Sequence, residues 1–362
     1  PHVSPARSAA LALDLTSGEI VYARNAGRSL APASTAKLPL TYALLTTLGP
    51  SFRIQTEVVG RGEQRGAVWH GDLVLIGRGD PSLSRADLAL LARTVRAKGI
   101  ARVTGSVVGD ESWFDARRTA PGWRASFYIR QSPPLSALVV DRGRYRGVVS
   151  RSPALAAAVV FREELRRAGV PAGRATTGRA GPYGLPLAAV ASPTLASLVR
   201  YMDRESDNFT AELLLKELGA VVAGEGTTTA GARVVTRELA ASAVPLDGVR
   251  IVDGSGLSTL NRLTVAALVA MLEAAWADPT LRRPLLDALP VAGVNGTLED
   301  RMRRPPARGQ VLAKTGTTRE ASALAGYVRG RYVFAILQNG NPVSSWWARV
   351  AQDRFATVLA AS

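Results

Sequence analysis

The sequence predicts an α+β fold in which an antiparallel sheet flanked by helices is split by an inserted β-rich domain. The chain has 362 residues, a length that favours two domains over one. Strand patterns lie near both termini and helical patterns lie between them, so one sheet is expected to contain strands from both ends. Short β-like runs separated by glycine interrupt this order. We therefore expect residues 1–52 and 184–362 to form one domain and residues 53–183 to form the inserted domain.

Near the N-terminus the pattern predicts a hairpin and then a helix. The strands of the hairpin are expected at residues 9–14 and 20–23. A helical pattern starts at Ser34 and ends before Gly49, with Pro39 near its beginning. Proline lacks a backbone donor and can bend a helix, so the shape of the first turns is left open.

The inserted domain is expected to contain strands and two helices. Its strand patterns cover residues 54–59, 72–76, 103–108 and 136–140. Its helical patterns cover residues 88–97 and 154–168. The glycine-rich stretch 173–184 is interpreted as a linker that returns to the first domain.

The remainder of the chain predicts five helices, three strands and a closing helix. The five helical patterns cover residues 195–203, 209–218, 231–242, 264–277 and 281–289. The strand patterns cover residues 311–313, 322–328 and 332–338, and the closing helix covers residues 346–360. We expect these strands to join the N-terminal hairpin in one sheet.

Composition excludes several kinds of site. The chain has no cysteine, which removes disulfides, thiolate metal sites and cysteine nucleophiles. Its two histidines, His2 and His70, are far apart in the sequence, so neither a Ser-His-Asp triad nor a histidine metal cluster is expected. We expect no metal and no cofactor, and a hydrolase of this composition needs a base other than histidine.

The charge and hydropathy of the chain limit its partners and location. The formal net charge is +16, but the arginines are spread along the whole length without a dense basic run, so we expect no nucleic-acid partner. No apolar run is long enough to span a bilayer. The sequence begins at Pro1 rather than at a methionine, so we expect that a leading segment was removed or is absent from the given sequence, and such a segment could have been an export signal. We expect an extracytoplasmic protein, either periplasmic or secreted and associated with the cell wall.

Three short motifs that carry chemistry occur once each and in order. They are Ser34-Thr35-Ala36-Lys37, Ser206-Asp207-Asn208 and Lys314-Thr315-Gly316-Thr317. Positions three apart on a helix share a face, so Lys37 can bring its amine to the Ser34 hydroxyl. The amine must be neutral to accept a proton, and burial together with the charge of Lys314 would lower its pKa. Arginine, which supplies 41 of the 45 cationic residues, could not act as this base.

Each motif alone also has a plainer explanation. Ser34 is a typical helix N-cap, and Ser206 with Asn208 is typical of a capping pair before a helix. Lys314 and Gly316 could mark the end of a strand, although a glycine beside a binding strand also lets a ligand approach closely. The presence of all three motifs in order favours the chemical explanation.

The chain resembles the low-molecular-mass class C penicillin-binding proteins, the type-4 D-Ala-D-Ala carboxypeptidase/endopeptidases. Beyond the three motifs, the resemblance rests on four further segments, at residues 71–81, 136–138, 253–258 and 289–298. It covers residues 8–340, nearly the whole chain. It implies a serine β-lactamase/DD-peptidase-like domain that is split by the inserted domain. It also implies two partners, namely peptidoglycan stem peptides and β-lactam antibiotics as covalent inhibitors.

The resemblance implies a serine-acylating mechanism. Ser34 would attack the carbonyl of the penultimate D-Ala, and Lys37 would take its proton. Ser206 would pass a proton to the leaving amine, and Asn208 would hold the substrate amide. The backbone N–H groups of Ser34 and Thr317 would form the oxyanion hole. Lys314, Thr315 and Thr317, on the strand that also contains Gly316, would receive the terminal carboxylate.

The chain also departs from its expected relatives. The stretch between Ser34 and Ser206 is longer than a β-lactamase needs and shorter than in larger family members. The length that is missing relative to larger family members falls at residues 141–149. We therefore expect the nested third domain of those relatives to be absent. No E-x-x-L-N segment lies between the second and third motifs, which argues against efficient β-lactam hydrolysis. A β-lactamase and a penicillin-sensing or wall-binding module without turnover remain alternatives, and the oligomeric state is not predicted.

Overall fold

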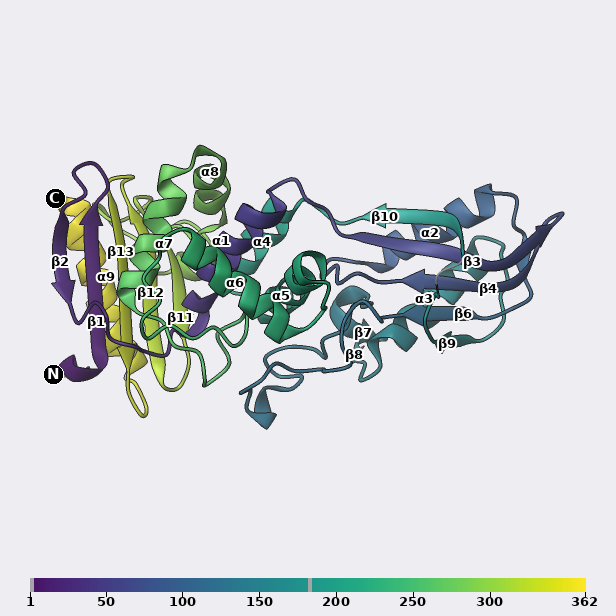
Figure 1. Cartoon of the computed structure of the whole chain (residues 1–362), viewed down its shortest axis with the longest axis horizontal. Helices are drawn as coiled ribbons and strands as arrows, with labels where there is room; N and C mark the ends of the chain where they lie inside the picture. Colours follow the sequence, from purple (N-terminus) through teal and green to yellow (C-terminus); the bar gives the residue numbers. More distant parts are fainter. Residues whose placement is uncertain (1–2, 182–183) are drawn as a thin grey trace.

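The structure is a computed structural model that describes residues 3–181 and 184–362. His2 and part of the expected linker therefore lie outside the described residues. Two lobes lie along the longest axis of the molecule, each with its own sheet (Figure 1). We call the segment from strand β3 to strand β10 the insert and the rest of the chain the main lobe.

Five antiparallel strands form the sheet of the main lobe, in the order β11-β12-β13-β1-β2. The strands are β1 (Ser8–Asp14), β2 (Ile20–Arg24), β11 (Val311–Thr317), β12 (Ala321–Val328) and β13 (Tyr332–Asn339). Strand β1 pairs with β13, so that Ser8 lies opposite Gln338. This pairing confirms the prediction that one sheet combines both ends of the chain.

Helices cover both faces of this sheet. On β13, Val333 and Leu337 belong to the core cluster that includes α7 (Val265–Ala277). Phe334, between them in the sequence, belongs to the cluster that includes α9 (Ser345–Ala361). Successive side chains of a strand point to opposite faces, so α7 and α9 pack on opposite sides of the sheet (Figure 1).

The remaining helices of the main lobe also follow the sequence pattern. They are α1 (Lys37–Leu48), α4 (Leu195–Arg204), α5 (Asn208–Ala223), α6 (Thr228–Ala241) and α8 (Pro279–Ala288). Pro39 lies in the first turn of α1, where backbone donors have no partner within the helix. This proline therefore removes no helical hydrogen bond.

The insert contains a mixed sheet in the order β10-β3-β4-β6-β9, with β5 beside β4. Its strands are β3 (Gln55–Arg65), β4 (Val68–Ile76), β5 (Arg102–Val103), β6 (Val107–Asp110), β9 (Ala175–Thr177) and β10 (Leu185–Ala191). The parallel pairs β4/β6 and β6/β9 are connected through α2 (Arg85–Ala97) and α3 (Pro153–Arg167). Trp69 and Phe161 are fully buried in the core between the sheet and these helices.

The structure differs from the sequence prediction at two places in the insert. The prediction of a strand at residues 136–140 is wrong: the segment is buried but has no strand partner. The Ala137 carbonyl instead accepts a hydrogen bond from the backbone of Gly79, in the loop after β4. The expected linker contains β9, and the unpredicted β10 pairs with β3, so the sheet of the insert extends to residue 191. The division into domains at residue 183 stays a prediction.

Residues 141–149, where the nested domain of larger relatives is expected to be missing, form a compact turn. A 3-10 turn (Asp141–Gly143) is followed by a hairpin of β7 (Arg144–Tyr145) and β8 (Val148–Val149). The chain then enters α3 directly. No further domain lies at this point of the described chain.

A small apolar cluster joins the two lobes. Phe114 and Leu135 of the insert are buried against Phe209 and Leu213 of α5. The insert therefore packs on the helix that begins with the second sequence motif. Within residues 3–181 and 184–362, no helix is both long enough and apolar enough to cross a membrane.

Candidate active site

Ser34 lies in a 3-10 turn (Ala33–Ala36) that leads directly into α1. Ala33 has a φ of 48°, a left-handed conformation that is costly for a residue with a side chain. Thr35 Oγ1 donates a hydrogen bond of 2.8 Å to the Pro32 carbonyl and holds the turn. The Ser34 side chain remains partly accessible, while its neighbours in the turn are buried.

Lys37 is fully buried beneath Ser34 and is held by three oxygen atoms. Its Nζ lies 2.7 Å from the Ser255 carbonyl oxygen, 2.9 Å from Asn208 Oδ1 and 3.3 Å from Ser34 Oγ. The first turn of α1 thus brings the amine to the serine, as the spacing predicts.

Burial lowers the pKa of Lys37 to about 8. The carboxylates of Asp203 and Asp253 oppose this shift because they favour the charged amine. The main cause is therefore desolvation rather than the charge of Lys314, which the sequence suggested as a contributor.

Lys314 and Ser206 form a second pair of lysine and serine. Lys314 Nζ donates to Ser206 Oγ at 2.9 Å and to the Thr315 carbonyl at 3.0 Å. Lys314 is fully buried, and burial together with the charge of Lys37 lowers its pKa. Ser206 has a φ of 55° in the tight connection between α4 and α5, which turns its side chain toward β11.

Asn208 is the first residue of α5 and contacts both lobes. Asp207 caps this helix by accepting a hydrogen bond of 2.8 Å from the backbone of Thr210. Asn208 Oδ1 accepts from Lys37, and its Nδ2 donates to the Gln131 carbonyl of the insert at 3.2 Å. The side-chain amide is therefore fixed at both ends.

The third motif lies on β11, at the edge of the main sheet. Thr315 Oγ1 donates to Thr297 Oγ1 at 2.7 Å, and Thr317 is exposed. A methyl group added at Gly316 would lie 2.8 Å from the Pro32 carbonyl oxygen and 3.0 Å from the Ser34 backbone nitrogen. The glycine thus lets β11 approach the turn that contains Ser34, so the protein itself occupies the space that the sequence suggested for a ligand.

Buried carboxylates that none of the three sequence motifs contains lie behind Ser34. Asp203 Oδ2 accepts a hydrogen bond of 2.7 Å from Thr41 Oγ1, and burial raises the pKa of Asp203. Asp203 continues the apolar stripe of α4, which buries Leu195, Leu198, Val199 and Met202. A charged residue at a position where the helical pattern expects a buried apolar one indicates a functional or paired carboxylate. The sequence therefore contained a signal for Asp203.

Glu212 and Asp253 hold the loop that contributes the Ser255 carbonyl. Glu212 Oε1 accepts from the backbone of Gly254 at 3.1 Å and from that of Ser255 at 2.8 Å. Asp253 accepts from the backbone of Ser258 at 2.6 Å and from Trp123 Nε1 of the insert at 2.8 Å. Burial raises the pKa of Glu212 to about 8. Both side chains act on Lys37 through the position of the loop, and the charge of Asp253 also raises the pKa of Lys37.

A cavity of about 600 Å³ adjoins the turn that contains Ser34. In the main lobe it is lined by Ala33, by Gly256 and by Thr317, the last residue of β11. The insert contributes Phe127 and Gln131. Both lobes therefore shape the space next to the serine.

The geometry brings together all eight residues that the sequence singled out. An antiparallel sheet with helices on both faces, and a serine–lysine pair at the start of the first helix, is the architecture of the serine DD-peptidases. The chain belongs to the D-Ala-D-Ala carboxypeptidase 3 (S13) family, which matches residues 1–151 and 145–361. By family it is a serine-type D-Ala-D-Ala carboxypeptidase.

Known relatives agree with this assignment. The chain is 31% identical to a D-alanyl-D-alanine carboxypeptidase of Actinomadura sp. (strain R39), with 99% of this chain and 82% of the relative covered. It is 32% identical to a carboxypeptidase of Mycobacterium tuberculosis, with 96% and 78% covered.

Solved structures share the fold. Penicillin-binding protein 4 of Haemophilus influenzae superposes with a TM-score of 0.87 at 21% identity and covers 97% of this chain and 96% of its own. A predatory peptidoglycan endopeptidase of Bdellovibrio bacteriovorus gives a TM-score of 0.64 at 17% identity, with 97% and 90% covered. The Bdellovibrio enzyme has also been solved acylated by penicillin G.

Proposed function

We propose that the protein cleaves D-Ala-D-Ala bonds in peptidoglycan stem peptides, and also acts as a DD-endopeptidase, through an acyl-enzyme on Ser34. The observation that carries this proposal is the buried Lys37 amine, 3.3 Å from a partly accessible serine hydroxyl. A nucleophilic serine requires an adjacent base, and the described site offers lysine where other serine hydrolases have histidine.

The hydrogen bonds of Lys37 can accommodate a neutral amine. A neutral amine has two N–H donors, which match the Ser255 carbonyl and Asn208 Oδ1. Its lone pair then faces Ser34 Oγ and can accept the hydroxyl proton during attack. A pKa of about 8 keeps a useful fraction of the amine neutral near pH 7.

Ser206 and Lys314 complete the reaction in this proposal. Ser206 relays a proton to the leaving amine, and Lys314 lies 2.9 Å from its hydroxyl. The backbone N–H groups of Ser34 and Thr317 form the oxyanion hole. Thr315 and Thr317, together with Lys314 and the backbone at Gly316, receive the terminal carboxylate, and Asn208 holds the substrate amide. Water then releases the acyl group from Ser34.

The proposed substrate supports a location outside the cytoplasm. Stem peptides of peptidoglycan are found in the periplasm or cell wall, so we propose that the protein acts there. β-Lactams mimic the D-Ala-D-Ala bond and acylate the same serine. The solved relative that is acylated by penicillin G supports this part of the proposal.

The test is labelling with a fluorescent penicillin, followed by intact mass measurement and by assay of D-Ala release from a pentapeptide. We expect a long-lived adduct that Ser34→Ala abolishes and that Ser17→Ala, at an exposed serine, leaves unchanged. We also expect D-Ala release and cleavage of a cross-linked muropeptide.

Other outcomes identify the alternatives. Rapid loss of the adduct would indicate a β-lactamase, and a stable adduct without peptide cleavage would indicate a penicillin-sensing module. Labelling of Ser34→Ala would overturn the assignment of the nucleophile.

A further inference from the structure

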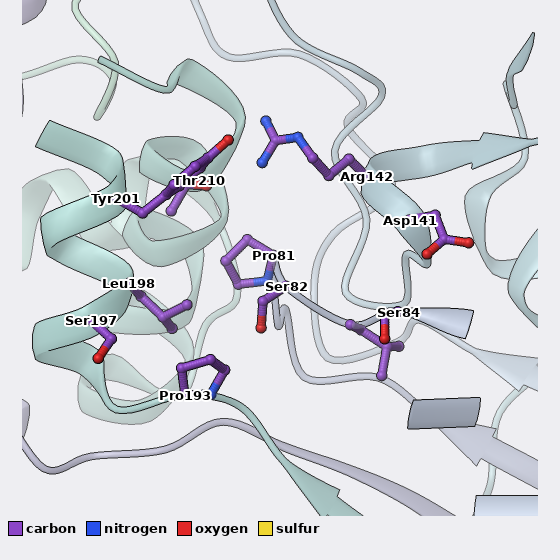
Figure 2. A pocket seen from close by; sticks show the side chains of 11 residues that line it. Pro81, Ser82, Ser84, Asp141, Arg142, Pro193, Ser197, Leu198, Tyr201 and Thr210 are labelled. Atoms are coloured by element: carbon purple, nitrogen blue, oxygen red, sulfur yellow. The ribbon is translucent and has the colours of Figure 1, made fainter. Parts of the chain in front are cut away.

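Arg142 of the insert reaches across the junction between the lobes to the start of α5. Its Nη2 donates to Asp207 Oδ2 at 2.5 Å. The guanidinium lies over the ring of Tyr201 at 5.6 Å and over the ring of Phe209 at 5.4 Å. Figure 2 shows its side chain extended toward the helices that carry Tyr201 and Thr210, while Asp141 points away from them. The two rings and the carboxylate fix the guanidinium in one position.

The backbone that presents Arg142 is held in an unfavourable conformation. Asp141 has a φ of 46° and Arg142 a φ of 55°, both in the left-handed region. The backbone of Asp141 donates to the Leu83 carbonyl at 2.9 Å, and its carboxylate accepts from the backbone of Arg85 at 3.1 Å. Consecutive residues with side chains persist in this region only where their surroundings over-determine them. The turn therefore directs the Arg142 guanidinium toward Asp207 rather than into the adjoining cavity of about 490 Å³.

Asp207 is the middle residue of the second motif. One of its oxygens caps α5 at Thr210, and the other accepts from Arg142. Its neighbours are Ser206, which contacts Lys314, and Asn208, which contacts Lys37. A change in the position of Asp207 would therefore move the two side chains of the second motif that touch the lysines.

We infer that Arg142 is a positioning residue for acylation, which acts through Asp207 to set Ser206 and Asn208 against the two lysines. The inference rests on the proposed function of Ser34. It gives the insert an indirect role in the chemistry, since Arg142 acts through Asp207.

The charge of Arg142 also affects the amine through Asp207. Five ionisable groups face Lys37: Asp203 on α4, Asp207 and Glu212 at or on α5, Asp253 in the loop, and Lys314 on β11. The negative charge of Asp207 raises the pKa of Lys37. Arg142 offsets that charge, so its removal would raise the pKa of Lys37 further. Acylation would then require a higher pH.

The test measures the second-order acylation rate of the full-length protein with fluorescent penicillin between pH 6 and pH 9. Arg142→Met is expected to lower the rate at pH 7 by about tenfold to a hundredfold and to shift the rising limb to higher pH. The matched control is Arg85→Met, since Arg85 forms its ion pairs with Glu163 and Glu164 inside the insert. In an Asp207→Asn background, Arg142→Met is expected to lower the plateau rate at high pH by less than twofold, because the guanidinium then has no carboxylate to position.

Arg142→Lys keeps the inference testable if the methionine variant does not fold. Lysine retains the positive charge but lacks the planar guanidinium with its fixed N–H donors. We therefore expect a lowered acylation rate, with the rise of the rate with pH at its wild-type position. Thermal unfolding of each variant shows whether the protein assayed is folded.

The inference is overturned if Arg142→Met acylates within twofold of Arg85→Met at every pH, or if its effect is unchanged in the Asp207→Asn background. If only Arg142→Lys folds, an acylation rate of that variant within twofold of the wild-type rate overturns the inference. Absence of labelling in the wild type would instead overturn the proposed function, so the two failures are distinguishable.

Discussion

Five ionisable side chains are buried together behind Ser34: Lys37, Lys314, Asp203, Glu212 and Asp253. Buried charges are costly unless they are paired or neutralised. Burial lowers the pKa of both lysines and raises the pKa of Asp203 and Glu212, so these four groups all shift toward their neutral forms. A cluster that favours neutral groups suits a lysine that must accept a proton.

The pH dependence of acylation tests this property of Lys37. The amine is active when neutral, so the acylation rate should rise with pH, by about tenfold per unit at low pH, and level off above about pH 8. Fluorescent penicillin measures the rate across pH 5.5 to 9.5. Lys37→Arg should remove the reaction because arginine stays charged, whereas Lys98→Arg, at an exposed lysine, should keep the profile. A rate that falls between pH 6 and pH 8 would contradict the assignment of the base.

At the scale of elements, β11 and the 3-10 turn that contains Ser34 fit against each other without a side chain between them. Gly316 allows this contact on one side of the turn. A second close contact involves Gly256, where an added methyl group would lie 1.9 Å from the Ala33 carbonyl oxygen. These two glycine contacts clamp the turn, which keeps Ser34 over Lys37.

Gly316→Ala tests the clamp. The added methyl group would push β11 away from the turn and displace Ser34 relative to Lys314. We expect the acylation rate to fall by about tenfold to a hundredfold and the free energy of unfolding to fall by about 1–3 kcal/mol. Gly27→Ala is the control because its methyl group meets no atom within 4 Å. Equal acylation rates in the two variants would show that the close contact is not needed.

The elements that could be predicted from the sequence are those with a periodic pattern. The terminal strands and the helices of the main lobe have such patterns. Strand β10 (Leu185–Ala191) has a proline and no regular alternation, and its pairing with β3 depends on a distant part of the chain. The motifs identified Ser34 and its partners, but the contact between Arg142 and Asp207 could not be predicted, because it exists only once the lobes are packed.

At the scale of the whole molecule, the insert contacts two parts of the site that surrounds Lys37, namely the start of α5 and the loop that contains Asp253. Gln131 accepts from Asn208, Trp123 donates to Asp253, and Arg142 donates to Asp207. The apolar cluster around Phe114 ties the same segment to α5. The lobes are therefore expected to be energetically coupled.

Calorimetry of Phe114→Ala measures this coupling. The wild type should unfold in one cooperative transition, because separating the lobes would expose the shared cluster. In the alanine variant the free energy of unfolding should fall by about 3–5 kcal/mol because the contact between the lobes is weakened. The variant should then show two transitions. Phe355→Ala, beside the α9 cluster, should lower the melting temperature and keep a single transition. Two transitions in the wild type would show that the lobes unfold independently.

The pairing of β1 with β13 also determines when the site can exist during synthesis. Ser8 pairs with Gln338, so β1 waits for a strand that is synthesised long after it. Ser34 likewise emerges long before Lys314. Contacts between such distant segments form slowly because a long loop must close first. A chain interrupted before residue 311 would contain the nucleophile and its base but none of β11, and so could not assemble the site.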